Sequence, residues 1–278
     1  NGGPYLQQLF ELPGYQNSIY KKVSGDGTID ISDGSIHEIR VHVKDAYGNT
    51  SFLSARVQFT GTASALPAST AKMFYPQMVD GLENTDAEFF LGERCLYDSV
   101  HINYKRTTAA APTVVSAVHS IGAAYIPLQD SMLIRIRPTQ SLTPDQLSHT
   151  VMQRFAGTRQ EVQSCDWQKG WAIARFREMG SFQLVLDETP PQIIPIGFKD
   201  GANMSKASRI VFTVKDNLES FRNFRATLDG KWLRFTNDKG RSFIYTFDEH
   251  CLSGPHTLQV SVEDIAGNKA VKTYSFVR

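Results

Sequence analysis

The strongest constraint on the fold is a segment that occurs twice, near the front of the chain and near its end. Residues 37–49 and 256–268 both alternate apolar and polar residues and then run into the pattern Asp-x-x-Gly-Asn. Alternation with a period of two is typical of a half-buried β-strand. The aspartate can accept hydrogen bonds from turn amides, and the glycine can adopt the left-handed conformation that closes a tight hairpin. The expected turn residues are Asp45, Gly48, Asn49, Asp264, Gly267 and Asn268.

Length and composition agree with a chain of β-modules. The 278 residues are enough for about two or three domains. The hydrophobic fraction of 41% suffices for packed cores, and 17 Phe with 10 Tyr suit β-structure. The sequence therefore predicts an all-β fold of tandem β-sandwich modules, of which at least the last is immunoglobulin-like.

Charge and hydropathy exclude two classes of partner. The 29 basic and 28 acidic residues balance, which gives no electrostatic footprint for nucleic acid or an anionic membrane surface. No apolar run approaches the roughly 18–20 residues that span a bilayer. We therefore expect no membrane span. We also expect no signal peptide, because the chain opens Asn1-Gly-Gly-Pro rather than with Met and a basic, then apolar, stretch.

Three blocks follow one another along the chain. Residues 1–60 hold five strand candidates, fewer than the roughly seven of a sandwich, so we expect a partial module whose opening strands lie upstream of Asn1. A stretch of small and polar residues, 60–70, is typical of a linker or a long loop. The strand candidates of this block are 5–12, 18–22, 28–31, 36–43 and 51–60.

The second block, residues 61–187, is predicted to be a β-rich domain. Thr143-Pro144 is a plausible helix start, but the residues up to Phe155 are equally compatible with a strand. The segment 178–180 is predicted to be a turn between two strands. The strand candidates are 88–91, 100–104, 132–137, 170–177 and 181–186, and 107–112 is predicted to be a loop.

The third block, residues 188–278, opens with a stiff junction at Pro190-Pro191. Asp229-Gly230 is a strong hairpin signal. About seven strands in roughly 90 residues predict an immunoglobulin-like β-sandwich. These candidates are 192–197, 208–215, 222–228, 231–236, 242–247, 256–263 and 270–277.

No catalytic constellation is visible in the sequence. The P-loop, the dinucleotide fingerprint and the Gly-x-Ser-x-Gly elbow are missing, and no histidine has a zinc-ligand spacing. Ligands that only the fold would bring together stay open. Three widely spaced cysteines form no disulfide framework, although one long-range bridge stays open. We therefore expect a chain with no catalytic residue, no metal and no cofactor. These histidines are His37, His42, His101, His119, His149, His250 and His256, and the cysteines are Cys95, Cys165 and Cys251.

Two weaker features point to ligands. Asp80, Glu83 and Asp86 are close enough in sequence for a loosely held calcium ion, although a solvated acidic loop is favoured. Tryptophans are also the residues that stack on sugar rings, but they serve burial more often, and one of the three lies in an alternating strand. The candidate platform consists of Trp167, Trp171 and Trp232.

Three stretches together carry a family resemblance. The first comprises 19–21, 33–34 and 37–49, the second 170–171, 178–182 and 187–191, and the third 228–232, 245–247 and 256–268. In order and spacing they resemble the non-catalytic C-terminal region of lysostaphin-type zinc endopeptidases, which are peptidoglycan hydrolases of Gram-negative anaerobes. The resemblance covers nearly the whole chain.

In that family an upstream catalytic domain binds zinc through His-x-x-x-Asp and His-x-His, and this chain contains neither motif. The resemblance therefore implies a non-enzymatic accessory region of an exported protein, in the periplasm or at the cell surface. It would position the peptidase domain or bind another envelope component, cell-wall glycan or peptide. Two alternatives stay open: a free-standing surface adhesin or glycan-binding protein, and an enzyme whose site assembles only in the fold.

Overall fold

The computed structural model describes residues 29–61, 71–109, 111–238 and 242–278. The chain divides into two compact units, residues 1–69 and 70–278. In the described ranges, 23 strands accompany a single five-residue helix, which confirms the predicted all-β class. The strands predicted at 5–12 and 18–22 lie outside the described residues.

The described part of the first unit is one hairpin. Strands β1 (His37–Lys44) and β2 (Thr50–Val57) pair antiparallel over their whole length. At the turn, Asp45 Oδ1 accepts hydrogen bonds from the amides of Tyr47 and Asn49, and Gly48 has a φ of 91°.

The strand predicted at 28–31 is wrong for its described residues, 29–31. These residues and those that follow form turns and irregular backbone. Asp30 accepts a hydrogen bond from the amide of Ser32, and Asp33 accepts one from the amide of Ser35. Aspartate side chains that bond the backbone two residues on favour turns over strand pairing, and this local preference prevails over the short apolar pattern.

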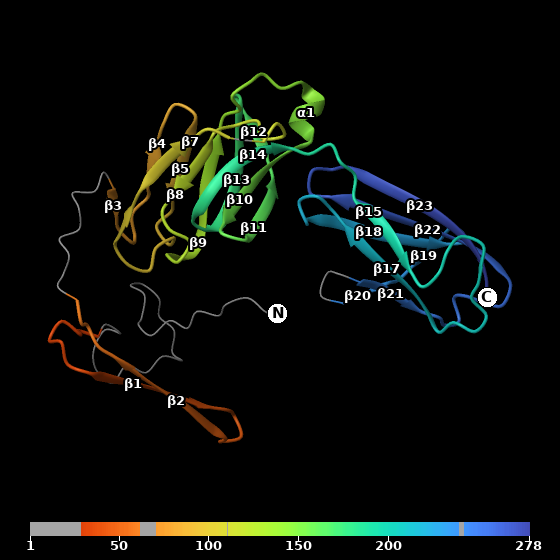
Figure 1. Ribbon diagram of the computed structural model, residues 1–278, viewed down its shortest axis with the longest axis horizontal. Coiled ribbons are helices and arrows are strands. Elements are labelled where there is room, and N and C mark those ends of the chain that lie inside the picture. The colour runs from red at the N-terminus through yellow and green to blue at the C-terminus, as the bar shows by residue number, and fades with distance from the viewer. Residues whose placement is uncertain (1–28, 62–70, 110, 239–241) are drawn as a thin grey trace. The chain divides into compact units, whose positions relative to one another are not determined.

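Residues 72–186 of the second unit form a sandwich of two five-stranded sheets (Figure 1). Phe176 of one sheet meets Phe182 of the other edge-on, with ring centroids 5.1 Å apart, so the inner faces share one core. The short strands β3 (Lys72–Phe74) and β6 (Val100–Ile102) pair separately. The first sheet has the order β11 (Arg159–Ser164), β10 (Thr150–Ala156), β14 (Gly180–Leu186), β8 (Val118–Ile121), β7 (Tyr104–Thr107). The second has the order β12 (Asp166–Gln168), β13 (Trp171–Glu178), β9 (Pro127–Ile136), β5 (Ala87–Leu91), β4 (Asp80–Glu83).

The segment after Thr143, for which helix and strand both stayed open, contains both. Helix α1 (Pro144–Ser148) begins with a capping box in which Thr143 and Gln146 bond each other's backbone amides. Strand β10 starts two residues after the helix ends. Over the described ranges, no helix has the length and apolar character needed to cross a membrane.

Residues 192–277 form the last sandwich, with sheets of four and five strands. The order corresponds to A-B-E-D and G-F-C of immunoglobulin domains, with short flanking strands on the second sheet. Asp229 and Gly230 close the hairpin between β18 (Phe221–Leu228) and β19 (Lys231–Leu233) with φ values of 51° and 82°. One sheet has the order β15 (Gln192–Ile196), β17 (Arg209–Lys215), β21 (Ser242–Thr246), β20 (Thr236–Asp238). The other has the order β16 (Ala202–Asn203), β23 (Lys269–Val277), β22 (Pro255–Asp264), β18 (Phe221–Leu228), β19 (Lys231–Leu233).

The single strand predicted at 231–236 is wrong. Leu233 pairs with β18 in one sheet, whereas Thr236 pairs with β21 in the other. The chain therefore switches sheets between these two residues, as a sandwich requires where a strand crosses from one layer to the next.

Candidate functional site

The three tryptophans do not form one platform. Trp171 is buried in the first sandwich, with the guanidinium groups of Arg135 and Arg137 stacked on its ring at 4.9 and 4.3 Å. Trp167 is half-buried and donates its indole N–H to the carbonyl of Leu147 at 3.0 Å. Trp232 lies in the other sandwich, on β19, and is 65% exposed. One indole is therefore available to a ligand.

Trp232 borders a hollow of about 350 Å³ on the sheet surface. An exposed aromatic face beside polar donors and acceptors is the combination that binds sugar rings. The other lining residues are Asn223, Phe224, Arg225, Ser261, Glu263 and Lys269.

The acidic segment around Asp80 is neutralised by its own neighbours. Asp80 pairs with Lys72, and Asp86 accepts a hydrogen bond from Arg106 at 2.7 Å. These cations engage two of the three carboxylates. The segment is not the solvated loop that the sequence favours, because Asp80 and Glu83 are the two ends of strand β4 and Asp80 is half-buried.

The first sandwich also contains a buried histidine. His119 is fully buried, its Nδ1 lies 2.9 Å from the Tyr104 hydroxyl, and burial lowers the pKa of its imidazole. Its Nε2 has no hydrogen-bond partner among the described residues. A ring closed off from solvent has no access to a substrate. His119 and Tyr104 therefore do not support the hypothesis of an enzyme whose site assembles only in the fold.

All three cysteines are free thiols. Burial raises the pKa of the Cys165 thiol to about 12, so this residue is no thiolate nucleophile at neutral pH.

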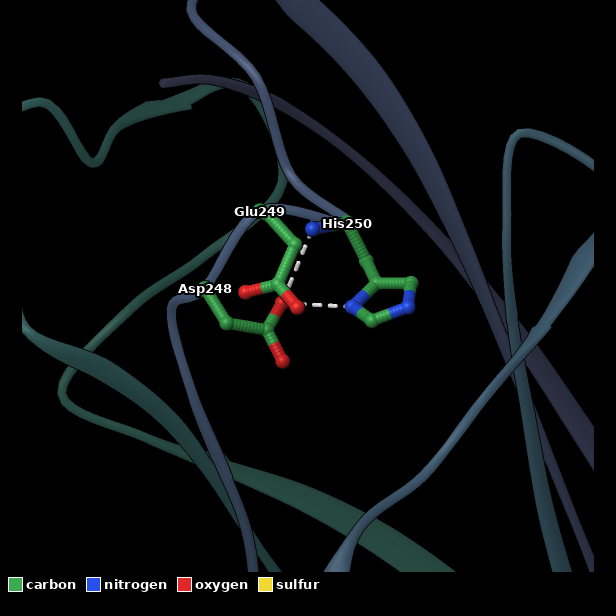
Figure 2. Close-up of side chains that lie close together, drawn as sticks. All are labelled: Asp248, Glu249 and His250. Atoms are coloured by element: carbon green, nitrogen blue, oxygen red, sulfur yellow. Dashed lines mark hydrogen bonds and ion pairs between the residues drawn. The ribbon is translucent and has the colours of Figure 1, made fainter.

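The described residues contain two groups of side chains that could together hold a metal ion. Figure 2 shows the first, Asp248, Glu249 and His250, which follow one another in the loop after β21. The Asp248 carboxylate accepts hydrogen bonds from the Tyr245 hydroxyl at 2.6 Å and from the His250 amide at 3.0 Å. The three side chains are exposed and Asp248 is already satisfied, so this group is a local turn.

The second group lies where the two sandwiches of the second unit join. Asp187 follows β14, Asp216 follows β17, and Asp264 ends β22. One carboxylate oxygen from each lies within 4.8 Å of the others. Asp187 and Asp264 are 1% and 0% exposed, and Asp216 is half-buried. Sequence reasoning named Asp264 only as a turn residue and did not identify the group.

Neighbouring amides fix each of these carboxylates. Asp187 Oδ1 accepts from the amide of Thr189 at 3.1 Å and from the Asn217 side chain at 2.9 Å. Asp216 Oδ2 accepts from the amides of Leu218 and Ser220, at 3.0 and 3.4 Å.

Asn268 connects the second copy of the turn to the segment after β14. The region where Asp187, Asp216 and Asp264 meet is called the joint. The amide and the side chain of Asn268 donate to Asp264 Oδ1 and Oδ2, at 2.8 and 2.9 Å, and Gly267 has a φ of 90°. The same side-chain nitrogen donates to the carbonyl of Asp187 at 2.7 Å.

The first aspartate of the repeated turn has its pKa shifted in opposite directions in the two copies. In the exposed first copy, hydrogen bonds from Asn49 lower the pKa of Asp45. In the second copy, burial raises the pKa of Asp264, and the charge of Asp187 raises it further. Burial also raises the pKa of Asp216, with the same sign of contribution from Asp187 and Asp264. The three carboxylates therefore repel one another in a poorly solvated place.

Because of this repulsion, we expect the stability of the second unit to depend on pH in metal-free buffer. The pKa of Asp216 is higher in the folded than in the unfolded chain, so its stabilising contribution is complete below the unfolded pKa and is lost as pH rises through the folded pKa. Asp216→Asn removes this penalty, keeps an acceptor for the two amides and adds a donor facing the other carboxylates. The variant should therefore have a higher Tm than the unaltered chain at pH 7. The difference should shrink as pH falls toward about 4, as measured by scanning calorimetry. A difference that grows on acidification would contradict this.

Comparison with known proteins gives one family match. Residues 71–187, which hold the first sandwich of the second unit, match the family model described as a Zu5-like domain. No curated protein matches the chain.

Several solved structures are similar at low identity. One contains fibronectin(III)-like modules of CbhA from Clostridium thermocellum, with 11% identity over 63% of this chain and 93% of that chain, at a TM-score of 0.26. Another is SGBP-B of the Bacteroides ovatus mixed-linkage glucan utilization locus, in complex with a mixed-linkage heptasaccharide, with 10% identity over 88% and 54%, at a TM-score of 0.22. An endo-β-1,4-mannanase from Thermotoga petrophila matches with 14% identity over 33% of this chain, at a TM-score of 0.28, and the match spans 20% of the mannanase. At these scores the similarities carry no argument about function.

Proposed function

We propose that the chain is a non-catalytic accessory region of an exported cell-envelope protein, and that its second unit is a fixed spacer that positions a neighbouring domain. The observation that carries this proposal is the packed joint. Two asparagine side chains bond to Asp187, and an apolar cluster surrounds the connection. A joint with buried polar bonds and apolar contacts resists bending, whereas a polar linker would allow it. The cluster consists of Val151, Val162, Val185 and Ala266, with Val114, Leu218 and Ile265 packed against it.

The resemblance to lysostaphin-type endopeptidases supports a peptidase as the neighbouring domain and peptidoglycan as its substrate. Positioning matters most for an insoluble polymer, because the enzyme must be held at a suitable height and angle to reach successive cross-links. A periplasmic or cell-surface location follows from that substrate.

The test uses the parent protein with its upstream domain. Replacing the exposed Pro190 and the buried Pro191 by glycine loosens the connection. The gain in backbone entropy of the unfolded chain costs about 1–2 kcal/mol of stability, and the lost packing of the Pro191 ring adds to this cost. We expect the rate of digestion of insoluble sacculi to fall severalfold, with hydrolysis of a short soluble peptide unchanged. Pro112→Gly, in an exposed loop of the first sandwich, is the matched control and should leave both rates unchanged.

Equal rates on sacculi for the double-glycine variant and the control would refute positioning. A parent protein without a peptidase domain would refute the peptidase as partner.

A second candidate function, glycan binding, is favoured by the exposed Trp232 and its hollow. Trp232→Ala should weaken binding of soluble peptidoglycan fragments by about 10-fold or more, because stacking of an indole on a sugar contributes on the order of 1.4 kcal/mol. Tyr125→Ala is the control, since Tyr125 is 87% exposed and lies away from this hollow. Isothermal titration calorimetry measures the effect, and equal affinities of the two variants would remove this candidate.

A further inference from the structure

The joint holds two buried carboxylate oxygens that accept no hydrogen bond. Asp187 Oδ2 and Asp216 Oδ1 are buried, and neither has a partner among the described residues. Buried polar atoms in native proteins are almost always satisfied, and an orphan points to a bound water or ion. For a charged oxygen the missing partner is more costly than for a neutral one.

The charge around these oxygens is also uncompensated. Over the described ranges, no lysine, arginine or histidine forms an ion pair with Asp187, Asp216 or Asp264. Other half-buried carboxylates of the same unit do have such partners; Glu88, for example, pairs with Arg135. Three nearby carboxylates without a cation are stable together only if they are protonated or share a bound cation.

The arrangement fits a divalent cation. Calcium binds oxygens at about 2.3–2.6 Å, so two oxygens on one ion can lie up to about 5 Å apart. The three aspartate oxygens lie within 4.8 Å of one another. The donors are all carboxylate oxygens, which favours a hard cation over zinc or copper. Calcium accepts irregular geometry, whereas magnesium requires near-ideal octahedral coordination.

We infer that Asp187, Asp216 and Asp264 form a calcium-binding site in the joint between the two sandwiches of the second unit. The site is pre-organised, because hydrogen bonds hold one oxygen of Asp187 and one of Asp216 in place. Asp187 Oδ1 accepts from the Thr189 amide and the Asn217 side chain, and Asp216 Oδ2 accepts from the amides of Leu218 and Ser220. The other oxygens of these two aspartates are the two orphans, which leaves them available to the ion.

The ion would connect three elements from both sandwiches. It binds the end of β14 on one side and the ends of β17 and β22 on the other, so it would stiffen the joint and make the spacer calcium-dependent. This role rests on the proposed positioning function, whereas calcium binding itself does not.

The test uses the intact chain, stripped of metal with EDTA and then freed of the chelator. Calcium is titrated into it, and isothermal titration calorimetry measures the binding. We expect one ion per chain. At a calcium concentration about 100-fold above Kd, mass action should raise the Tm of the second unit by about 5–10 °C. All three tryptophans lie in this unit, so their fluorescence reports its unfolding.

Asp216→Asn separates binding from folding. In EDTA the variant should be at least as stable as the unaltered chain, yet its calcium affinity should fall by about 10-fold or more, because a carboxylate ligand is lost. Glu249→Gln removes one charge from the exposed group of Figure 2 and is the matched control, with unchanged affinity expected.

The proposed site would be refuted if calcium bound the Asp216→Asn variant as tightly as the unaltered chain. It would also be refuted if calcium left the Tm of the unaltered chain unchanged. An equal response to magnesium would overturn its assignment to calcium. Neither result bears on the sacculus assay, so a failure of the site and a failure of the positioning function can be told apart.

Discussion

Replacing Asn268 by alanine should destabilise the second unit by about 2–4 kcal/mol. The side chain is 7% exposed, and its nitrogen donates to the carbonyl of Asp187 and to the carboxylate of Asp264. Without it, two buried acceptors at the joint lose a donor, one of them charged, and water has little access to replace it. Urea unfolding followed by tryptophan fluorescence measures the loss.

Asn203 provides the matched control in the same sandwich. Its side chain is exposed and accepts one hydrogen bond, from the amide of Ser205 at 3.0 Å. Asn203→Ala should change the stability by about 0.5 kcal/mol or less, since solvent replaces the lost bond. Equal losses for the two alanine variants would show that the joint is not a buried polar network.

The second large effect is expected at Arg154 in the first sandwich. Arg154 is 2% exposed, and its Nε and Nη2 donate to the carbonyl of Met179 at 3.0 and 2.7 Å. Nη2 also lies 2.7 Å from Glu178. The guanidinium thereby fixes the turn before β14, the strand that leads directly to Asp187.

Arg154→Ala should cost about 3–4 kcal/mol, below the upper end for a broken buried ion pair because Glu178 is partly exposed and stays hydrated. Arg175→Ala, at an exposed position of β13, is the control, and it should change the stability by about 0.5 kcal/mol or less. Hydrogen exchange in β14 should be faster in the Arg154 variant alone. A stability loss no larger than that of the control would contradict a structural role for this arginine.

Strands whose side chains alternate cleanly could be predicted from the sequence. The predicted strand 132–137 ends one residue beyond β9, and 256–263 lies within β22. Both strands bury one face, and their other face is half-buried or exposed. Where one face of a strand is buried, a period of two is unavoidable, so the sequence reports it directly.

Other strands give no such signal. β11 (Arg159–Ser164) contains one buried residue, Val162, because it is the edge of its sheet and carries polar side chains. Its position is set by pairing with β10 across a two-residue loop that begins with Gly157, at a φ of 60°. Such a strand becomes recognisable only when its partner is known.

The acidic site was hidden for a different reason. Aspartate is common in turns, so Asp187, Asp216 and Asp264 each have a local explanation when they are considered separately. They lie far apart in sequence, and only the packing of β14, β17 and β22 brings their carboxylates together. The repeat even suggested that Asp45 and Asp264 are equivalent, although burial gives them opposite electrostatics.

A fixed spacer requires that the two sandwiches of the second unit move as one body, and ¹⁵N relaxation of the intact chain in calcium measures this most directly. We predict that amides of residues 72–186 and 192–277 fit one common rotational diffusion tensor. Two distinct correlation times, each close to that of an independent sandwich, would contradict a fixed spacer.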